Sequence, residues 1–213
     1  MKLLIIISGL YLGEEHKNNI QILDNYMKQT GIDFEYCGIS SQDDFHIFED
    51  IIKFKYKNIN TQLQLSKICD FITYYKKTLD YDWYIKIRPD IKLLGNIPFD
   101  MLSENAINAR MRAYLGPKKI KYGNSVNGEG IFKSINNSDY VDTEVSTIMD
   151  DMLYIFHKNI IKKGAFETLP HIDSKQDEWF HSTIFNNRNI KMNIIGINMC
   201  NTRLGVYSGD TNM

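Results

Sequence analysis

A chain of 213 residues is long enough for one buried α/β core, and its hydrophobic fraction of 43% and charged fraction of 24% are those of a folded globular protein. Its formal net charge of -1 supplies no positive field for nucleic acid or for an anionic membrane surface. The numbers therefore exclude a disordered or fibrous class and argue against nucleic-acid binding.

The first residues predict a buried strand. Lys2 is followed by five aliphatic residues, and the run ends at Ser8-Gly9, which is too soon for the apolar part of a signal peptide. No other apolar run approaches the roughly 18–20 residues that cross a bilayer, so we expect no membrane insertion. The three cysteines are odd in number and far apart. They predict free thiols in a reducing compartment such as the cytoplasm.

Strands and helices then alternate along the chain. In order we expect a helix over residues 15–29, a strand over 32–39, a strand or short helix over 47–54, a helix over 65–79, strands over 83–87 and 106–115, a strand from 151 passing into a helix, a helix over 177–187 and a final strand over 190–197. Residues 116–142 have the composition of a long surface loop, and we expect an active-site flap there. This alternation predicts a single α/β domain with a mixed, mostly parallel sheet flanked by helices.

Ligands of open α/β sheets bind outside the carboxyl ends of the strands. Asp80-Tyr81-Asp82 spells Asp-x-Asp but precedes its strand, so it belongs to the opposite edge. Arg88-Pro89-Asp90 follows the same strand. There the Asp90 carboxylate can bind a hard divalent cation that bridges two phosphate oxygens, and Arg88 can orient it or contact the phosphates. The alternative is a simple surface ion pair between Arg88 and Asp90.

The domain size and the order of the expected elements resemble the glycosyltransferase domains that chlorella viruses use in capsid glycan synthesis. Three segments together resemble the metal-dependent glycosyltransferases of the GT-A fold. They are residues 60–62, residues 81–90 and Asp150-Asp151 before an aliphatic run. An Arg-x-Asp element replaces the usual Asp-x-Asp, which leaves one carboxylate fewer for the metal. The resemblance implies a UDP-sugar donor, a glycan or glycoprotein acceptor, and Mn²⁺ or Mg²⁺ at Asp90. We expect residues 1–94 to form the nucleotide-binding half and residues 95–213 the acceptor-binding half.

The resemblance also assigns roles to the nucleotide-binding half. The loop after the first strand would contact the base and ribose through Ser8, Gly9, Leu10 and Tyr11, with the Tyr11 ring stacking on uracil; the alternative is an ordinary βα turn. Lys67 would reach the diphosphate; the alternative is a solvated lysine on a helix.

Carboxylate pairs are candidates for the catalytic groups. Asp150 and Asp151, expected at a strand edge, would hold sugar hydroxyls or act as a base, or else merely punctuate the strand end. Asp177 and Glu178 would line the acceptor pocket or supply the base, or else favour the positive end of a helix dipole. His171 and His181 could complete the metal sphere, or be satisfied core or surface residues. These candidate carboxylates are compatible with both retention and inversion of the anomeric configuration.

Other classes fit the sequence less well. A dinucleotide-dependent oxidoreductase needs Gly-x-Gly-x-x-Gly, whereas the first loop has Gly9 and Gly13 at the wrong spacing. The P-loop and nucleophile-elbow motifs are missing as well. A non-catalytic carbohydrate- or nucleotide-binding scaffold with the same fold stays open.

Overall fold

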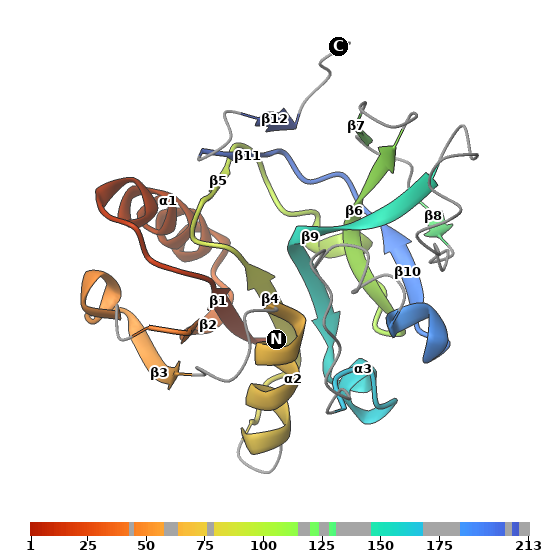
Figure 1. Ribbon diagram of the computed structural model, residues 1–213, viewed down its shortest axis with the longest axis horizontal. Helices are drawn as coiled ribbons and strands as arrows, with labels where there is room; N and C mark the ends of the chain where they lie inside the picture. The colour runs from red at the N-terminus through yellow and green to blue at the C-terminus, as the bar shows by residue number, and fades with distance from the viewer. Residues whose placement is uncertain are drawn as a thin grey trace.

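The computed structural model describes residues 1–42, 45–57, 64–75, 79–114, 120–123, 128–130, 146–167, 184–202 and 206–208 (Figure 1). Its main sheet has nine strands, in the order β3-β2-β1-β4-β9-β6-β10-β8 with β7 paired to β6. These strands are β1 (Lys2–Ser8), β2 (Asp33–Ser40), β3 (Ile52–Lys57), β4 (Trp83–Ile87), β6 (Ala106–Tyr114), β7 (Ile120–Gly123), β8 (Gly128–Gly130), β9 (Ser146–His157) and β10 (Lys191–Ile194).

The remaining elements cover or extend this sheet. A small second sheet has the order β12-β11-β5. The elements are β5 (Ile91–Leu93), β11 (Met199–Asn201), β12 (Val206–Ser208), the helices α1 (Glu14–Thr30), α2 (Gln64–Tyr75) and α3 (Lys158–Lys162), and the 3-10 turns η1 (Phe45–Phe48) and η2 (Phe99–Met101). No helix in the described part of the chain is long and apolar enough to span a bilayer.

The first half of the sheet is parallel. β1 pairs in parallel with β2 on one side and with β4 on the other, and β2 pairs in parallel with β3. β9 runs antiparallel to both β4 and β6, while β10 is parallel to β6. The chain thus builds outward from β1 in one direction and then crosses to its other side for β4. Such a reversal opens a crevice at the carboxyl ends of β1 and β4, where α/β sheets bind ligands.

Side chains of β1 alternate between two cores, which explains its unbroken aliphatic run. Leu4 and Ile6 face one cluster together with apolar residues of α2, and Leu3, Ile5 and Ile7 face the other with apolar residues of α1. All five side chains are fully buried. Because both faces of the strand are covered, every position along its aliphatic run is apolar. The carboxyl end of this buried strand borders the crevice.

Three sequence expectations change in detail. Residues 47–54 hold parts of both the turn η1 and the strand β3. The strand expected from Asp151 begins five residues earlier, at Ser146. The strand expected over residues 190–197 is present as β10 but is shorter, and it is not the final strand, because β11 and β12 follow it.

Candidate functional site

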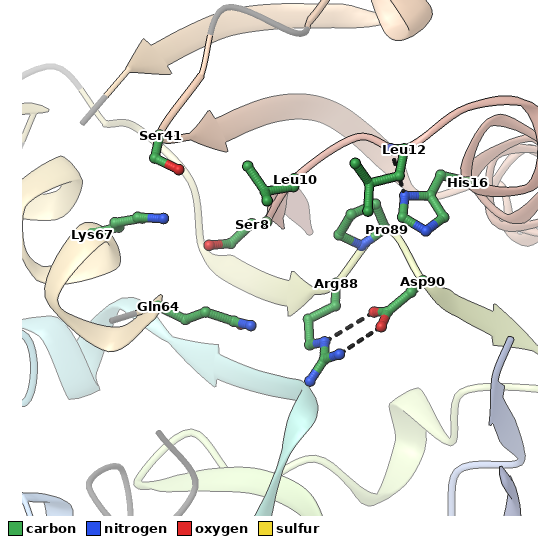
Figure 2. Close-up of a pocket in the computed structure, with 11 residues that line it drawn as sticks. Ser8, Leu10, Leu12, His16, Ser41, Gln64, Lys67, Arg88, Pro89 and Asp90 are labelled. Carbon is green, nitrogen blue, oxygen red and sulfur yellow. Dashed lines mark hydrogen bonds and ion pairs between the residues drawn. The ribbon is translucent and has the colours of Figure 1, made fainter. Parts of the chain in front are cut away.

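A cavity of about 190 Å³ lies at the carboxyl edge of β1, β2 and β4 (Figure 2). Ligand pockets commonly measure about 300–1,000 Å³, so this one encloses a part of a nucleotide-sized ligand. All described residues that line it come from the first 90 positions. They are Ser8, Gly9, Leu10, Leu12, His16, Ser41, Gln64, Lys67, Arg88, Pro89 and Asp90.

The Arg88 and Asp90 side chains form a two-pronged ion pair at the cavity. Arg88 Nε donates to Asp90 Oδ1 at 2.9 Å and Nη2 donates to Oδ2 at 2.5 Å. The side chains of Arg88 and Asp90 are 20% and 6% exposed, so this is not a solvated surface pair. Both carboxylate oxygens are therefore engaged, and the guanidinium plane is held in one orientation.

Segments distant in the sequence fix the turn that carries this pair. Asn19, on α1, donates from Nδ2 to the Pro89 carbonyl at 3.2 Å and to Thr202 Oγ1 at 3.1 Å. The Thr202 amide donates to the Asp90 carbonyl at 2.9 Å. The carbonyls of Pro89 and Asp90 thus have partners from distant segments, and the turn has little freedom to move.

The loop after β1 approaches the same turn at Gly9. Its φ is +150°, and a Cβ built there would lie 2.9 Å from Pro89 Cδ. A side chain at this position would both strain the backbone and clash with the proline ring. Glycine therefore allows the β1 loop and the Arg88–Asp90 turn to form one continuous cavity wall.

Tyr11 does not line this wall. Its ring is 4% exposed and packs against Phe45 and Phe48, with centroid distances of 5.6 and 4.7 Å. Its hydroxyl donates to the Ile7 carbonyl at 2.9 Å. The ring expected to stack on uracil is thus part of the core in this structure, whereas Ser8, Gly9 and Leu10 of the same loop do face the cavity.

Lys67 lines the cavity from α2 and is only 4% exposed. Figure 2 shows Lys67 and Ser41 toward one end of the cavity, and His16 and Asp90 toward the other. The amine expected to reach the diphosphate therefore lies at the end away from the Asp90 carboxylate.

Sequence reasoning missed Leu12 and three polar lining residues, which are His16, Ser41 and Gln64. Ser41 directly follows β2, so the strand-end rule applied to that strand would have found it. Gln64 is the first residue of α2, and His16 lies in the first turn of α1. No short motif in the sequence marks either of these two positions.

Asp150 and Asp151 lie inside β9 and not at a strand edge, which corrects the sequence interpretation. Asp150 is fully buried, and its Oδ2 accepts from both Nε and Nη2 of Arg110, with Nε at 2.8 Å. Its Oδ1 accepts from the Met152 amide at 3.1 Å. Asp151 is 1% exposed, and neither aspartate lines the cavity. The sequence does not reveal this position inside the strand, because the partner of Asp150 stands 40 positions away.

The Asp80-Tyr81-Asp82 segment lies at the opposite edge of the sheet, before β4, as the strand-end rule predicts. Asp82 accepts hydrogen bonds from Lys158 Nζ at 2.7 Å and from the Lys2 amide at 3.1 Å. These bonds, that from Lys158 first, hold the pKa of Asp82 below its usual value. Asp82 therefore ties β4 to its neighbours and is not presented to the cavity.

The described residues, as arranged, do not fit a divalent cation. Asp90 is the one carboxylate among the described lining residues, and Arg88 occupies both of its oxygens. The Nδ1 atom of His16 already accepts a hydrogen bond from the Leu12 amide at 3.0 Å. Nowhere in the described ranges do three or more His, Cys, Asp or Glu side chains gather as a metal site would require. Asp177, Glu178, His171 and His181 lie outside the described residues.

No protein-family model and no curated protein sequence matches the chain. Solved structures do match its fold. The catalytic domain of Drosophila β1,4-galactosyltransferase 7 in complex with xylobiose has a TM-score of 0.53 at 10% identity, covering 99% of this chain and 71% of that one. A mutant of that enzyme in complex with manganese, UDP-Gal and xylobiose gives 0.51 at 11% identity, with the same coverages.

A second kind of enzyme shares the fold to the same degree. The nucleoside-diphosphate-sugar pyrophosphorylase of Vibrio cholerae has a TM-score of 0.52 at 10% identity, covering 92% of this chain and 91% of that one. A glycosyltransferase involved in glycosylation of the major capsid of PBCV-1 has a TM-score of only 0.38 at 9% identity, covering 76% of this chain and 64% of that one. This TM-score is too low to indicate a shared fold. The likenesses confirm the expected α/β fold, which nucleotide-sugar enzymes of both kinds use.

Proposed function

We propose that the chain is a glycosyltransferase that moves a sugar from a UDP-sugar to a hydroxyl of a glycan or glycoprotein acceptor. The observation that carries the proposal is the cavity between the ends of β1 and β4, with Arg88 on its wall. This is the position at which α/β sheets bind nucleotides. The fold is shared with a galactosyltransferase whose structure holds UDP-Gal, which supports uridine as the base.

The charges of the cavity suit a diphosphate. Lys67 and Arg88 are cationic and Asp90 is the one described anionic residue, so the wall carries a net charge of about +1. In sugar transfer the leaving diphosphate gains negative charge, and a guanidinium fixed in advance, as that of Arg88 is, stabilises such charge.

The remaining roles follow from the resemblance. Residues 95–213 would bind the acceptor, and Asp177 or Glu178 would be the catalytic carboxylate. The buried thiols are free, which suits the predicted reducing, cytoplasmic setting. Since the described donor set does not fit a cation, the proposal assigns the charge of the diphosphate to Arg88. Whether the predicted Mn²⁺ or Mg²⁺ takes part in binding is tested by titration with and without the metal.

Calorimetric titration with UDP, CDP and GDP, in EDTA and again with Mn²⁺, tests the proposal. We expect UDP to bind best and Arg88→Met to bind it at least about 10-fold more weakly, the loss of one charged hydrogen bond. Lys28→Met is the matched control, because it removes the same charge from an exposed position on α1. Unchanged UDP affinity of Arg88→Met would show that the cavity is not the diphosphate site.

Turnover separates the remaining candidates. The likeness to the Vibrio pyrophosphorylase favours nucleotidyl transfer as a second candidate. A screen of UDP-sugars for release of UDP, run beside a screen of UTP and sugar phosphates for release of pyrophosphate, distinguishes the two. We expect UDP release. Pyrophosphate release would replace sugar transfer by nucleotidyl transfer, and binding without either product would leave the non-catalytic scaffold.

A further inference from the structure

His16 presents a fixed hydrogen-bond donor to the cavity. The residue lies in the first turn of α1, lines the cavity and is only 4% exposed. Its Nδ1 accepts a hydrogen bond from the Leu12 amide at 3.0 Å. Because a ring nitrogen that accepts cannot carry the proton, the neutral imidazole has its proton on Nε2. The bond to Leu12 thus selects one tautomer and orients the ring (Figure 2).

The cavity wall holds polar groups that the described residues leave without a partner, and one of them, the Ser8 hydroxyl, is buried. The bond to Leu12 is the hydrogen bond that the described structure gives His16, and it engages Nδ1 and not Nε2. Ser8 Oγ is fully buried, faces the same cavity and has no partner among the described residues. Buried polar groups are normally satisfied, so each exception calls for a partner. A ligand that accepts hydrogen bonds would supply it.

The surroundings of His16 favour an anionic acceptor. His16 lies in the first turn of α1, so it stands at the positive end of the dipole of that helix, and the N-cap residue Gly13 has no side chain that could cap the free amides there. The fixed guanidinium of Arg88 lines the same cavity. Figure 2 places His16 toward the Asp90 end of the cavity, and Asp90 is the ion-pair partner of Arg88, to which the proposed function assigns the charge of the diphosphate.

We propose that His16 Nε2–H donates a hydrogen bond to a phosphate oxygen of the bound nucleotide. This inference rests on the proposed function and adds to it a binding residue that no sequence motif marks. The imidazole acts as a neutral donor, so its contribution is directional and comes in addition to the charge of Arg88.

Two substitutions of His16 separate the ligand bond from the bond to Leu12. In His16→Asn the amide oxygen takes the place of Nδ1 and still accepts from the Leu12 amide, but nothing reaches the position of Nε2. In His16→Gln the amide nitrogen reaches the position of Nε2 and donates, but the acceptor at the position of Nδ1 is lost. Affinities for UDP and for uridine are measured by calorimetry on the full chain, with thermal unfolding as a check of the fold.

We expect His16→Asn to weaken UDP binding about 10-fold and to leave uridine binding unchanged, while His16→Gln keeps UDP binding within about threefold of wild type. The inference is overturned if His16→Asn binds UDP like wild type, or loses UDP and uridine affinity alike. It is also overturned if His16→Gln is the weaker variant, because the bond to Leu12 would then be the one that matters. If the wild-type chain binds no UDP at all, both the proposed function and this inference are wrong.

Discussion

Replacing Gly9 by alanine should damage both the stability of the fold and the cavity wall. At φ +150° a residue with a Cβ is strained, which costs about 1–3 kcal/mol. The new Cβ would also lie 2.9 Å from Pro89 Cδ and 3.3 Å from Pro89 Cγ. Pro89 cannot rotate away, because its ring is closed on the backbone and its carbonyl is bonded to Asn19. The turn itself must therefore shift.

A shift of the turn moves the Arg88 guanidinium, so the loss extends to ligand binding. We expect Gly9→Ala to lower the free energy of unfolding by about 2–4 kcal/mol, the sum of the strain and of a small overpacking cost. For a chain of this size that corresponds to a fall in Tm of roughly 2–4 °C per kcal/mol. UDP affinity should fall about 10-fold, the value of a misplaced charged hydrogen bond.

Gly31→Ala is the matched control. Gly31 ends α1 with φ +68°, and an added Cβ there meets nothing within 4 Å. The control therefore carries backbone strain, about 1–2 kcal/mol, without the clash. Both variants should lose stability in urea or thermal unfolding, but only Gly9→Ala should lose UDP affinity. Equal UDP affinity in the two variants, or a Gly9→Ala chain as stable as wild type, would refute the role assigned to the contact with Pro89.

Four further predictions test other parts of the structure. Asp90→Asn should weaken UDP binding equally in EDTA and in Mn²⁺ if Asp90 serves to orient Arg88; a loss seen only with Mn²⁺ in calorimetry would make it a metal ligand. Asp150→Asn should lower the free energy of unfolding by about 3–5 kcal/mol in urea titrations, because it removes the carboxylate charge that pairs with the buried guanidinium of Arg110; a loss below about 1 kcal/mol would contradict this. Burial raises the pKa of the Cys69 thiol to about 12, so a thiol reagent at neutral pH should label it only after denaturation; rapid labelling of the native chain, read by mass spectrometry, would show that the site opens. Hydrogen bonds from Lys53 and then Tyr81 lower the pKa of Glu35. Its contribution to stability is therefore present above the unfolded-state pKa and is lost as the pH falls through the lowered folded-state pKa. Glu35→Gln should flatten the stability curve below the ordinary glutamate pKa of about 4.3, and an unchanged curve would rule this out.

The parts of the fold that follow local rules could be predicted from the sequence. The aliphatic run of β1 and the end of α1 at Gly31 depend on neighbours in the chain, and the structure confirms both. The strand-end rule likewise predicted that Arg88 and Asp90 share an edge with the loop after β1. These are statements about direction and spacing, which a sequence carries without knowledge of the tertiary contacts.

The sequence did not predict the positions of residues whose side-chain contacts depend on the tertiary structure. Tyr11 follows a strand end, where an exposed ring could stack on a base, but Phe45 and Phe48 draw it into the core. Two successive aspartates are typical of a strand edge, yet Asp150 lies in the middle of β9. It can do so because Arg110 on β6 pairs with its carboxylate charge. His16 gained its orientation from a backbone amide, which no residue type signals.

The Arg88–Asp90 pair shows why the two sequence interpretations of this motif, an ion pair or a ligand site, are compatible. Burying each charge costs several kcal/mol before the attraction between them is counted, and well-packed apolar residues are often as stabilising as such a pair. Fold stability alone therefore gives little reason for two buried charges at this turn. Their position gives one, because the Ser8 hydroxyl and the His16 imidazole open onto the same cavity. A guanidinium held rigid by its own carboxylate meets an arriving anion without further ordering of the side chain, so part of the cost of binding is already met in the free protein.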